Sequence, residues 1–252
     1  MGHFYVWKFQ ARHRLLAILL ISFLCATFIY TKSPITLPTF TQDKPVAITK
    51  GNDKEKKIAL TFNISWGDTK VYDILNVLKE HELRATFFVS GEWAERHPHI
   101  LEEITKNKHE VGMLGYRYQS YVEQDIEDVK KDIQEAIQVF NKLGFDHMTY
   151  IRPPSGHFNK EIIETIEQIG LEPVHWSVHP NDSENPGTKA ISNQLIQKVT
   201  NGDIILLHAS DAAKQTAEAL NAIIPALHDK KLQFVTLSEL IQQVSLEEEL
   251  IE

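Results

Sequence analysis

An arginine, a carboxylate and a histidine each follow a short apolar run in the second half of this chain. Arg152 precedes a Pro-Pro pair, Asp182 follows Trp176, and His208 ends the run 204–207. An imidazole can exchange a proton near neutral pH, and an arginine can orient a carboxylate or a bound polar group. Each residue also has a structural alternative. Arg152 and Asp182 could form an ion pair within the core, and a lone histidine is more often a satisfied core residue.

Segments with strand and helix periodicity alternate through residues 57–244 and should position these side chains. Alternation of this kind predicts a parallel sheet covered by helices, closed as a barrel or open and doubly wound. Asn159 is predicted to cap one helix, and Thr236 with Glu239 forms a capping box for the last one. The seven β-rich runs are 58–62, 85–89, 110–113, 148–152, 173–176, 204–207 and 233–235.

Functional groups of such folds gather just past the carboxyl ends of the parallel strands. The rule selects five segments here, and their residue types are unusual for loops. Because Arg152, Asp182 and His208 all fall in these segments, we interpret them together as a catalytic or binding site. The five segments are 63–67, 114–119, 152–159, 176–182 and 208–211.

These segments resemble the NodB-homology polysaccharide deacetylases, carbohydrate esterase family four. The resemblance spans about residues 57–244 and implies a distorted (β/α)7-type barrel. Some stretches are most similar to the sporulation-associated members found in spore-forming bacilli. The five matching motifs, in chain order, are Thr-Phe-Asn-Ile at 61–64, the segment 110–118, Arg-Pro-Pro-Ser-Gly at 152–156, Trp176 with Asp182, and Leu-Leu-His at 206–208.

The resemblance implies a role for each matching residue. In the family, an aspartate and two histidines hold a divalent metal, usually zinc, and a second aspartate is the base. His208 matches the family's acid, and Arg152 with Asp182 matches an arginine–aspartate pair that orients the base. The backbone N–H of Ser155 matches a donor to the oxyanion.

This chain departs from the family pattern at the base and at the metal ligands. Asn63 occupies the base position, where an amide can bind a polar group but cannot take its proton. Ile64, Leu114 and Tyr118 occupy the metal positions, and two of the three are hydrocarbon. We therefore predict no metal at these positions and no conventional metal-dependent hydrolysis.

Histidines elsewhere offer a substitute metal site only weakly. His175 and His179 are four residues apart and His157 lies on a neighbouring loop. That spacing suits zinc on a helix, whereas this stretch has the pattern of a strand followed by a loop.

Three functions remain open at this point. The chain could bind N-acetylated glycan, with peptidoglycan of the spore envelope as the partner, and hydrolyse little of it. It could be an active hydrolase of carbohydrate N-acetyl bonds through an atypical site, or a membrane-tethered assembly protein without catalysis. Four aromatic residues at the strand ends are candidates for sugar stacking, with burial in the core as the alternative: Trp66, Trp176, Tyr116 and Tyr118.

Composition excludes several other classes. The chain has 252 residues with 26 basic and 34 acidic side chains, a net charge of −8. An acidic balance argues against nucleic-acid binding, which needs a basic surface. A single cysteine, Cys25, excludes an intrachain disulfide and a cysteine-based zinc site.

The N-terminus has the pattern of a signal anchor. Residues 15–30 are apolar and uncharged and follow Lys8, Arg12 and Arg14. Positive charge before an apolar run places the first residues in the cytoplasm and the rest outside. We predict a single-pass anchor in 1–32, or a secreted protein if it is cleaved. The domain organisation that we predict is anchor 1–32, tether 33–56, deacetylase-like domain 57–244 and acidic tail 245–252.

Overall fold

The computed structural model describes residues 46–242, together with the isolated positions 20 and 22. The predicted anchor, most of the tether and the acidic tail lie outside the described residues. Among the described residues, no helix is both long and apolar enough to cross a bilayer. Every named strand and helix belongs to the compact unit that spans 44–252.

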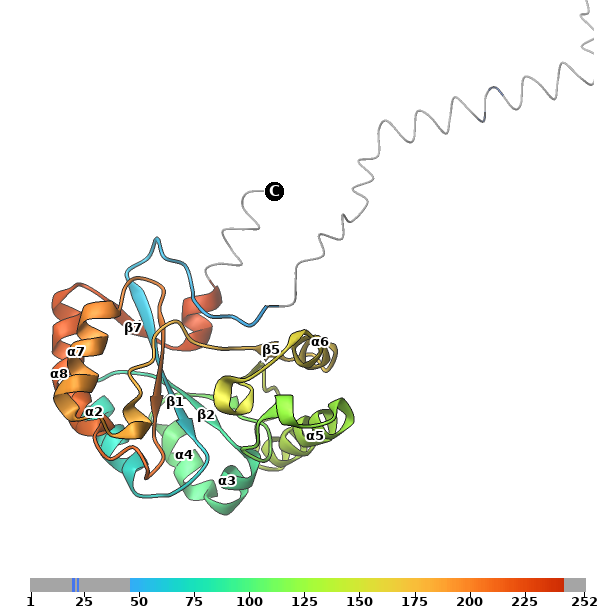
Figure 1. Cartoon of the computed structure of the whole chain (residues 1–252), viewed down its shortest axis with the longest axis horizontal. Helices are drawn as coiled ribbons and strands as arrows, with labels where there is room; N and C mark the ends of the chain where they lie inside the picture. Colours follow the sequence, from blue (N-terminus) through green and yellow to red (C-terminus); the bar gives the residue numbers. More distant parts are fainter. Residues whose placement is uncertain (1–19, 21, 23–45, 243–252) are drawn as a thin grey trace, which may run out of the picture. The chain divides into compact units, whose positions relative to one another are not determined.

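The core of this unit is a seven-stranded sheet in the order β5-β4-β3-β2-β1-β6, with β7 also paired to β1 (Figure 1). Every pairing of these strands is parallel, as the alternating pattern predicts. The strands are β1 (Lys57–Ile64), β2 (Thr86–Val89), β3 (Glu110–Met113), β4 (Tyr150–Ile151), β5 (Glu172–Pro173), β6 (Ile204–His208) and β7 (Gln233–Val235).

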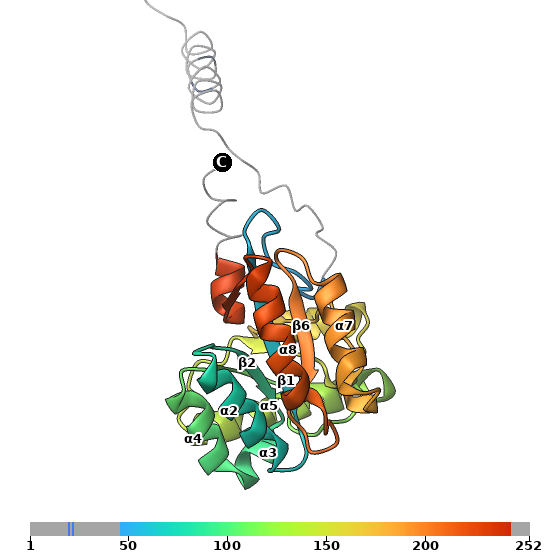
Figure 2. The ribbon, with the colours of Figure 1, turned by 90° about the vertical axis from the view of Figure 1, so that its left-hand side faces the viewer.

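Helices cover the outside of the sheet, and α2, α8 and α7 lie side by side in Figure 2. Sequence periodicity predicts most of them, but it misses α3, which is too short to repeat an apolar stripe. The α-helices are α2 (Lys70–Glu80), α3 (Gly91–Arg96), α4 (Pro98–Lys106), α5 (Ile126–Lys142), α6 (Lys160–Gln168), α7 (Thr188–Lys198) and α8 (Thr216–Asp229), and the short 3-10 helices are η1 (Tyr121–Glu123), η2 (Pro154–Gly156) and η3 (Asp182–Glu184).

Both predicted helix caps are confirmed. The Asn159 side chain accepts a hydrogen bond from the backbone N–H of Ile162 at 3.0 Å. Thr236 N–H donates to Glu239 Oε2 at 3.0 Å, and Glu239 N–H donates back to Thr236 Oγ1 at 3.4 Å. The reciprocal pair is the capping box expected from the sequence.

The sheet forms a half-barrel rather than a closed ring of seven strands. Its two ends, β5 and β6, come together through the segment that follows β5. Leu206 N–H donates to Val178 O at 2.9 Å, and Val178 forms a bridge with Ile205. The expected parallel α/β fold is thus confirmed, and the closed barrel is not: a short irregular segment, not a strand, lies between β5 and β6.

The last residues of the predicted tether belong to this domain. Ala47 is 2% exposed, Ile48 pairs with Val174, and Lys50 pairs with Asp203. Because these pairings join residues 48 and 50 to the domain, a tether ends before them rather than at residue 56.

Alternation along β1 explains which side chains enter the half-barrel. Leu60, Phe62 and Ile64 belong to the large core between the sheet and the helices. Side chains of a strand point to opposite faces in turn, so Thr61 and Asn63 point into the half-barrel. The interior therefore receives two polar side chains from its central strand.

Candidate functional site

The carboxyl ends of the strands bring the predicted residues together. The β1–β6 register pairs Asn63 with His208, the last residue of β6. Arg152 directly follows β4, and Asp182 begins η3 after the segment that closes the half-barrel. Parallel strands thus place residues that are far apart in sequence at one edge of the sheet.

Arg152 is fully buried and organises the interior of this edge. Its Nη1 donates to Asn63 Oδ1 at 2.8 Å, and its Nη2 donates to Thr61 Oγ1 at 2.9 Å and to His175 O at 3.0 Å. The guanidinium carbon lies 4.0 Å from the centre of the Phe88 ring. Burial lowers the pKa of Arg152 to about 9, which still leaves the group charged at neutral pH.

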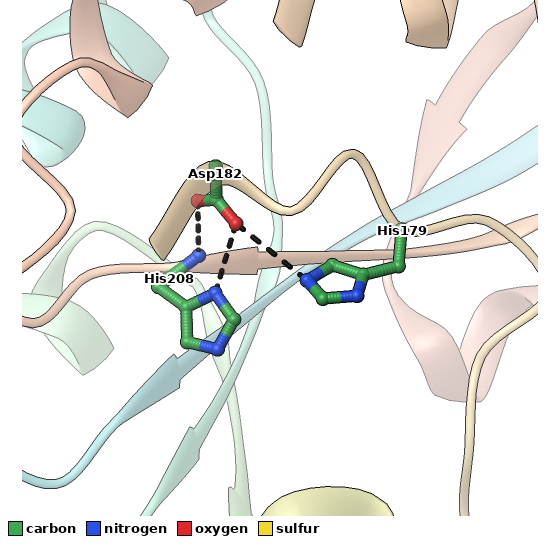
Figure 3. Close-up of side chains that lie close together, drawn as sticks. All are labelled: His179, Asp182 and His208. Atoms are coloured by element: carbon green, nitrogen blue, oxygen red, sulfur yellow. Dashed lines mark hydrogen bonds and ion pairs between the residues drawn. The ribbon is translucent and has the colours of Figure 1, made fainter. Parts of the chain in front are cut away.

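Asp182 is also fully buried and is bound to the end of β6 (Figure 3). Its Oδ2 accepts hydrogen bonds from the backbone N–H of His208 at 2.8 Å and from the hydroxyl of Thr216 at 2.7 Å. Its Oδ1 lies 2.8 Å from Nδ1 of His208, so that ring nitrogen is assigned as the proton-bearing one. The carboxylate thereby fixes the orientation of the imidazole.

The expected pair between Arg152 and Asp182 does not form. Within residues 46–242, the ion pairs of Asp182 are with His179 and His208, and the arginine donates to neutral oxygens. Sequence alone could not separate these arrangements, because it does not reveal that Arg152 points toward β1. Of the two residues, only Arg152 contacts the base position.

His179 is a second histidine close to Asp182. The sequence pattern placed it with other histidines as a candidate metal ligand, not with Asp182. Nε2 of His179 lies 3.9 Å from Asp182 Oδ1, is buried, and has no hydrogen-bond partner among the described residues. Burial lowers the pKa of His179, as does the neighbouring His208. The ligand atoms of His179, Asp182 and His208 all lie within 4.8 Å of one another (Figure 3).

The other two histidines considered for a metal site are not in this cluster. His175 stacks on Trp176 with the ring centres 3.6 Å apart, and burial lowers the pKa of His175. His157 is exposed on the preceding loop. A His-x-x-Asp spacing in a turn, as at 179–182, is the signal that would have found the cluster.

The family's metal positions do not gather ligands in this structure. Ile64 and Leu114 are both fully buried, the first in the core under the helices and the second in a smaller core with Phe88. Tyr118 is 38% exposed in the loop after β3. Two hydrocarbon side chains and one phenol supply no set of donors for a hard or borderline cation, so the family metal does not fit here.

The four candidate aromatics separate into two groups. Trp66 is 63% exposed and Tyr118 is 38% exposed, so both rings are available to a ligand. Tyr116 and Trp176 are half-buried. Trp176 packs so closely over Gly156 that a Cβ there would lie 2.1 Å from the ring, which makes this tryptophan partly structural.

Ser155 occupies the tight turn behind Arg152. Its side chain is exposed and its backbone is left-handed, with φ 60° and ψ 1°. A non-glycine residue in this region is uncommon and stores local strain, a feature that recurs in ligand-binding loops. The donor role that the resemblance implies for the N–H of this residue stays a prediction.

Two carboxylates that sequence reasoning missed hold the surrounding loops. Asp211 accepts hydrogen bonds from the N–H groups of Thr69 at 2.9 Å and Lys70 at 2.7 Å, at the start of α2. Asp132 accepts from the N–H groups of Tyr116 at 2.9 Å and Arg117 at 2.8 Å. Asp132 could have been found from the sequence, because it is an acidic residue on the apolar face of α5.

Comparison with known proteins agrees with this geometry. Residues 50–174 match the family model described as polysaccharide deacetylase. The chain is 32% identical over 193 residues to a peptidoglycan-N-acetylglucosamine deacetylase of Bacillus cereus, covering 75% of this chain and 90% of that protein. This chain belongs to the polysaccharide deacetylase family. The family expected from the strand-end motifs is thereby confirmed.

Other members of the polysaccharide deacetylase family show the range of its activities. A chitooligosaccharide deacetylase of Sinorhizobium fredii is 32% identical, with 69% of this chain and 86% of that protein covered. A solved pseudoenzyme of carbohydrate esterase family four from Bacillus anthracis has a TM-score of 0.73 and 25% identity, covering 78% of this chain and 69% of that one. A mutant of that pseudoenzyme with restored enzymatic activity has the same TM-score, identity and coverage of this chain.

Proposed function

We propose that this chain binds an N-acetylated glycan, peptidoglycan, at its strand-end site and hydrolyses little of it by the usual metal-dependent route. The strand-end site is defined here as Asn63, Arg152, His179, Asp182 and His208. The observation that carries the proposal is the contrast within one sheet edge. The polar network around Arg152 is intact, whereas the family's metal positions are buried hydrocarbon at Ile64 and Leu114.

Different residues would supply hydrogen bonds and stacking surfaces to the ligand. Arg152 engages the oxygen of Asn63, which directs the amide NH₂ away from the guanidinium and leaves two N–H donors for a ligand. Trp66 and Tyr118 offer exposed rings with an apolar face and a polar edge, which suits a sugar ring. Asn63 cannot take a proton from water, so binding without hydrolysis follows from the same residue.

The cellular setting is part of the proposal. The peptidoglycan of the spore envelope is the proposed ligand, supported by motif stretches similar to sporulation-associated members of the family. The basic flank and apolar run of residues 8–30 support an anchor that holds the domain outside the cytoplasm, with a secreted form as the alternative. A peptidoglycan deacetylase among the relatives supports the same class of glycan.

One observation favours a second function. The Asp182–His208 pair is fully assembled and could donate a proton to a leaving amine. An active hydrolase of N-acetyl bonds that uses an atypical site is therefore the second candidate.

The test combines binding and acetate release for the full chain with N-acetylated peptidoglycan oligomers. We expect saturable binding by calorimetry and acetate at the background level. Trp66→Ala should weaken binding about fivefold, since one stacked ring contributes roughly 1 kcal/mol. His147→Ala removes an exposed ring in the loop before β4 and is the matched control.

Each outcome has a distinct meaning. Acetate release that Arg152→Ala abolishes would establish the hydrolase and overturn the binding function. If no binding is detected, the remaining hypothesis is that the chain is a membrane-tethered assembly protein. Equal loss in Trp66→Ala and His147→Ala would contradict the place assigned to the glycan.

A further inference from the structure

We propose that His179, Asp182 and His208 form a binding site for one divalent transition-metal ion, of which zinc is the representative. The site uses none of the family's metal positions. The inference does not rest on glycan binding, because it follows from three side chains alone.

The separations of the ligand atoms suit one ion. Protein ligands lie about 2.0–2.2 Å from zinc, so two ligands of one tetrahedral ion are about 3.3–3.6 Å apart. Asp182 Oδ1 is 2.8 Å from His208 Nδ1 and 3.9 Å from His179 Nε2. An ion bound by His208 Nδ1 would replace the proton assigned to that nitrogen, which would pass to the other ring nitrogen or to solvent. One ligand atom from each of the three residues lies within 4.8 Å of the other two, so closure on a common ion needs the widest pair to approach by at most roughly 1.5 Å.

The surroundings of Asp182 prepare one oxygen for this role. Its Oδ2 is already held by the hydroxyl of Thr216 and the backbone N–H of His208. Among the described residues, the printed polar contacts of its Oδ1 are with the two imidazoles (Figure 3). Outer hydrogen bonds that orient a ligating carboxylate are a general property of metal sites.

His179 is placed as a ligand and has no other evident polar role for its ring. Its Nε2 is buried and unpartnered among the described residues, at a distance from Oδ1 that is too long for a hydrogen bond. The backbone of His179 is fixed by a hydrogen bond from Gln194 Nε2 to its carbonyl oxygen at 2.9 Å. An ion between Nε2 and Oδ1 would satisfy a polar atom that is otherwise orphaned.

Charge supports the same assignment. Asp182 is fully buried, and no lysine or arginine within residues 46–242 forms an ion pair with it. Burial of a carboxylate is costly even with hydrogen bonds, and a divalent cation would add the compensating charge that no lysine or arginine of the described residues supplies. Two imidazoles and one carboxylate leave coordination positions open and suit zinc or another first-row metal.

The competing explanation of this cluster is that Asp182 and His208 form a proton-donating pair, in which His179 has no role. Substitution of His179 therefore distinguishes the two explanations. Titration of the full chain with Zn²⁺, followed by calorimetry and by metal analysis after desalting, should show one equivalent at this site. His179→Ala should remove that equivalent or lower its affinity at least 100-fold.

His175→Ala is the matched control, because His175 is a half-buried imidazole on the same segment but outside the cluster. It should keep the stoichiometry and change the affinity less than about threefold. His179→Gln, which preserves size and polarity, should lose the ion as well. Circular dichroism and urea unfolding of each variant show whether it is folded.

The proposal is overturned if the folded chain retains no zinc, or if His179→Gln binds zinc like the unmodified chain. Equal loss in His175→Ala and His179→Ala would also overturn it, since the ion would then lie elsewhere. Co²⁺ gives an independent readout. Its visible absorption should appear on binding to the unmodified chain and be absent from His179→Gln.

Discussion

The two halves of the strand-end edge are equally buried and chemically opposite. In the polar half, Arg152 and Asp182 are fully buried, and each makes three hydrogen bonds with its neighbours. In the apolar half, Ile64 and Leu114 are fully buried among hydrocarbon. The two halves share one sheet and one set of strand ends.

The difference shows what burial demands of each chemistry. Hydrocarbon gains free energy from leaving water and needs no particular partner. A buried charge costs free energy that hydrogen bonds only partly offset, and Nε of Arg152 is buried without a partner among the described residues. A well-packed apolar replacement is often as stable. Arg152 and Asp182 therefore contribute a defined geometry more than stability, which is the property that a binding site needs.

The largest effect should come from introducing a charge into the apolar half. Ile64→Asp places a carboxylate among hydrocarbon and should lower the free energy of unfolding by more than about 4 kcal/mol. Ile64→Val is the control and should cost about 1 kcal/mol. Urea unfolding followed by circular dichroism measures both. A cost for Ile64→Asp no larger than that of the control would mean that this half contains donors or water.

Removal of a charge from the polar half should cost nearly as much. Asp182→Ala leaves the backbone N–H and ring of His208 and the hydroxyl of Thr216 without their acceptor. The expected loss of unfolding free energy is about 3–5 kcal/mol. Asp146→Ala, at an exposed carboxylate, should stay within about 0.5 kcal/mol. Similar values for the two variants would contradict the network.

A carboxylate at the base position should have a smaller effect of the opposite sign. Asn63→Asp places a negative charge 2.8 Å from Nη1 of Arg152, which has no carboxylate partner within residues 46–242. We expect a gain of about 1 kcal/mol at pH 7, because a charge-assisted hydrogen bond replaces a neutral one.

The same variant should release no acetate from N-acetylated oligomers. Asn63→Asp supplies a base, but Ile64 and Leu114 still supply no ligands. Acetate release by this single variant would show that the apolar half does not prevent hydrolysis.

An effect of similar size should come from Asp211, a carboxylate outside both halves that joins the loop after β6 to the start of α2. Burial alone would raise the pKa of Asp211, but hydrogen bonds from the N–H groups of Lys70, Thr69 and Asp68 lower it below its usual 3.8. A lowered carboxyl pKa stabilises the fold above pH 3.8 and loses that effect as the pH falls through the lower value. Asp211→Ala should cost about 1 kcal/mol at pH 7.

The pH dependence is the check on this last prediction. Urea unfolding at pH 7 and near pH 2–3 should show the difference between Asp211→Ala and the unmodified chain shrinking on acidification, as the carboxylate protonates. A difference that is the same at both pH values would mean that Asp211 acts through packing.

Local sequence information was sufficient for most of the elements and for two of the helix caps. The apolar periods of α5 and β6, the cap at Asn159 and the capping box at Thr236 each depend on neighbouring residues and appear as predicted. The strand-end rule also selected Arg152 and His208, because in a parallel sheet every carboxyl end lies at one edge. The family followed from motifs at the same positions.

Only the tertiary structure determined which side chains of the site contact one another. The register of β1 against β6 sets Asn63 beside His208, and the direction of the Arg152 side chain gives Asn63, not Asp182, as its partner. The closing segment after β5 brings His179 to Asp182. Hydrophobic periodicity is a property of adjacent residues, whereas a hydrogen bond across a half-barrel depends on strand order, register and side-chain direction, which no single segment contains.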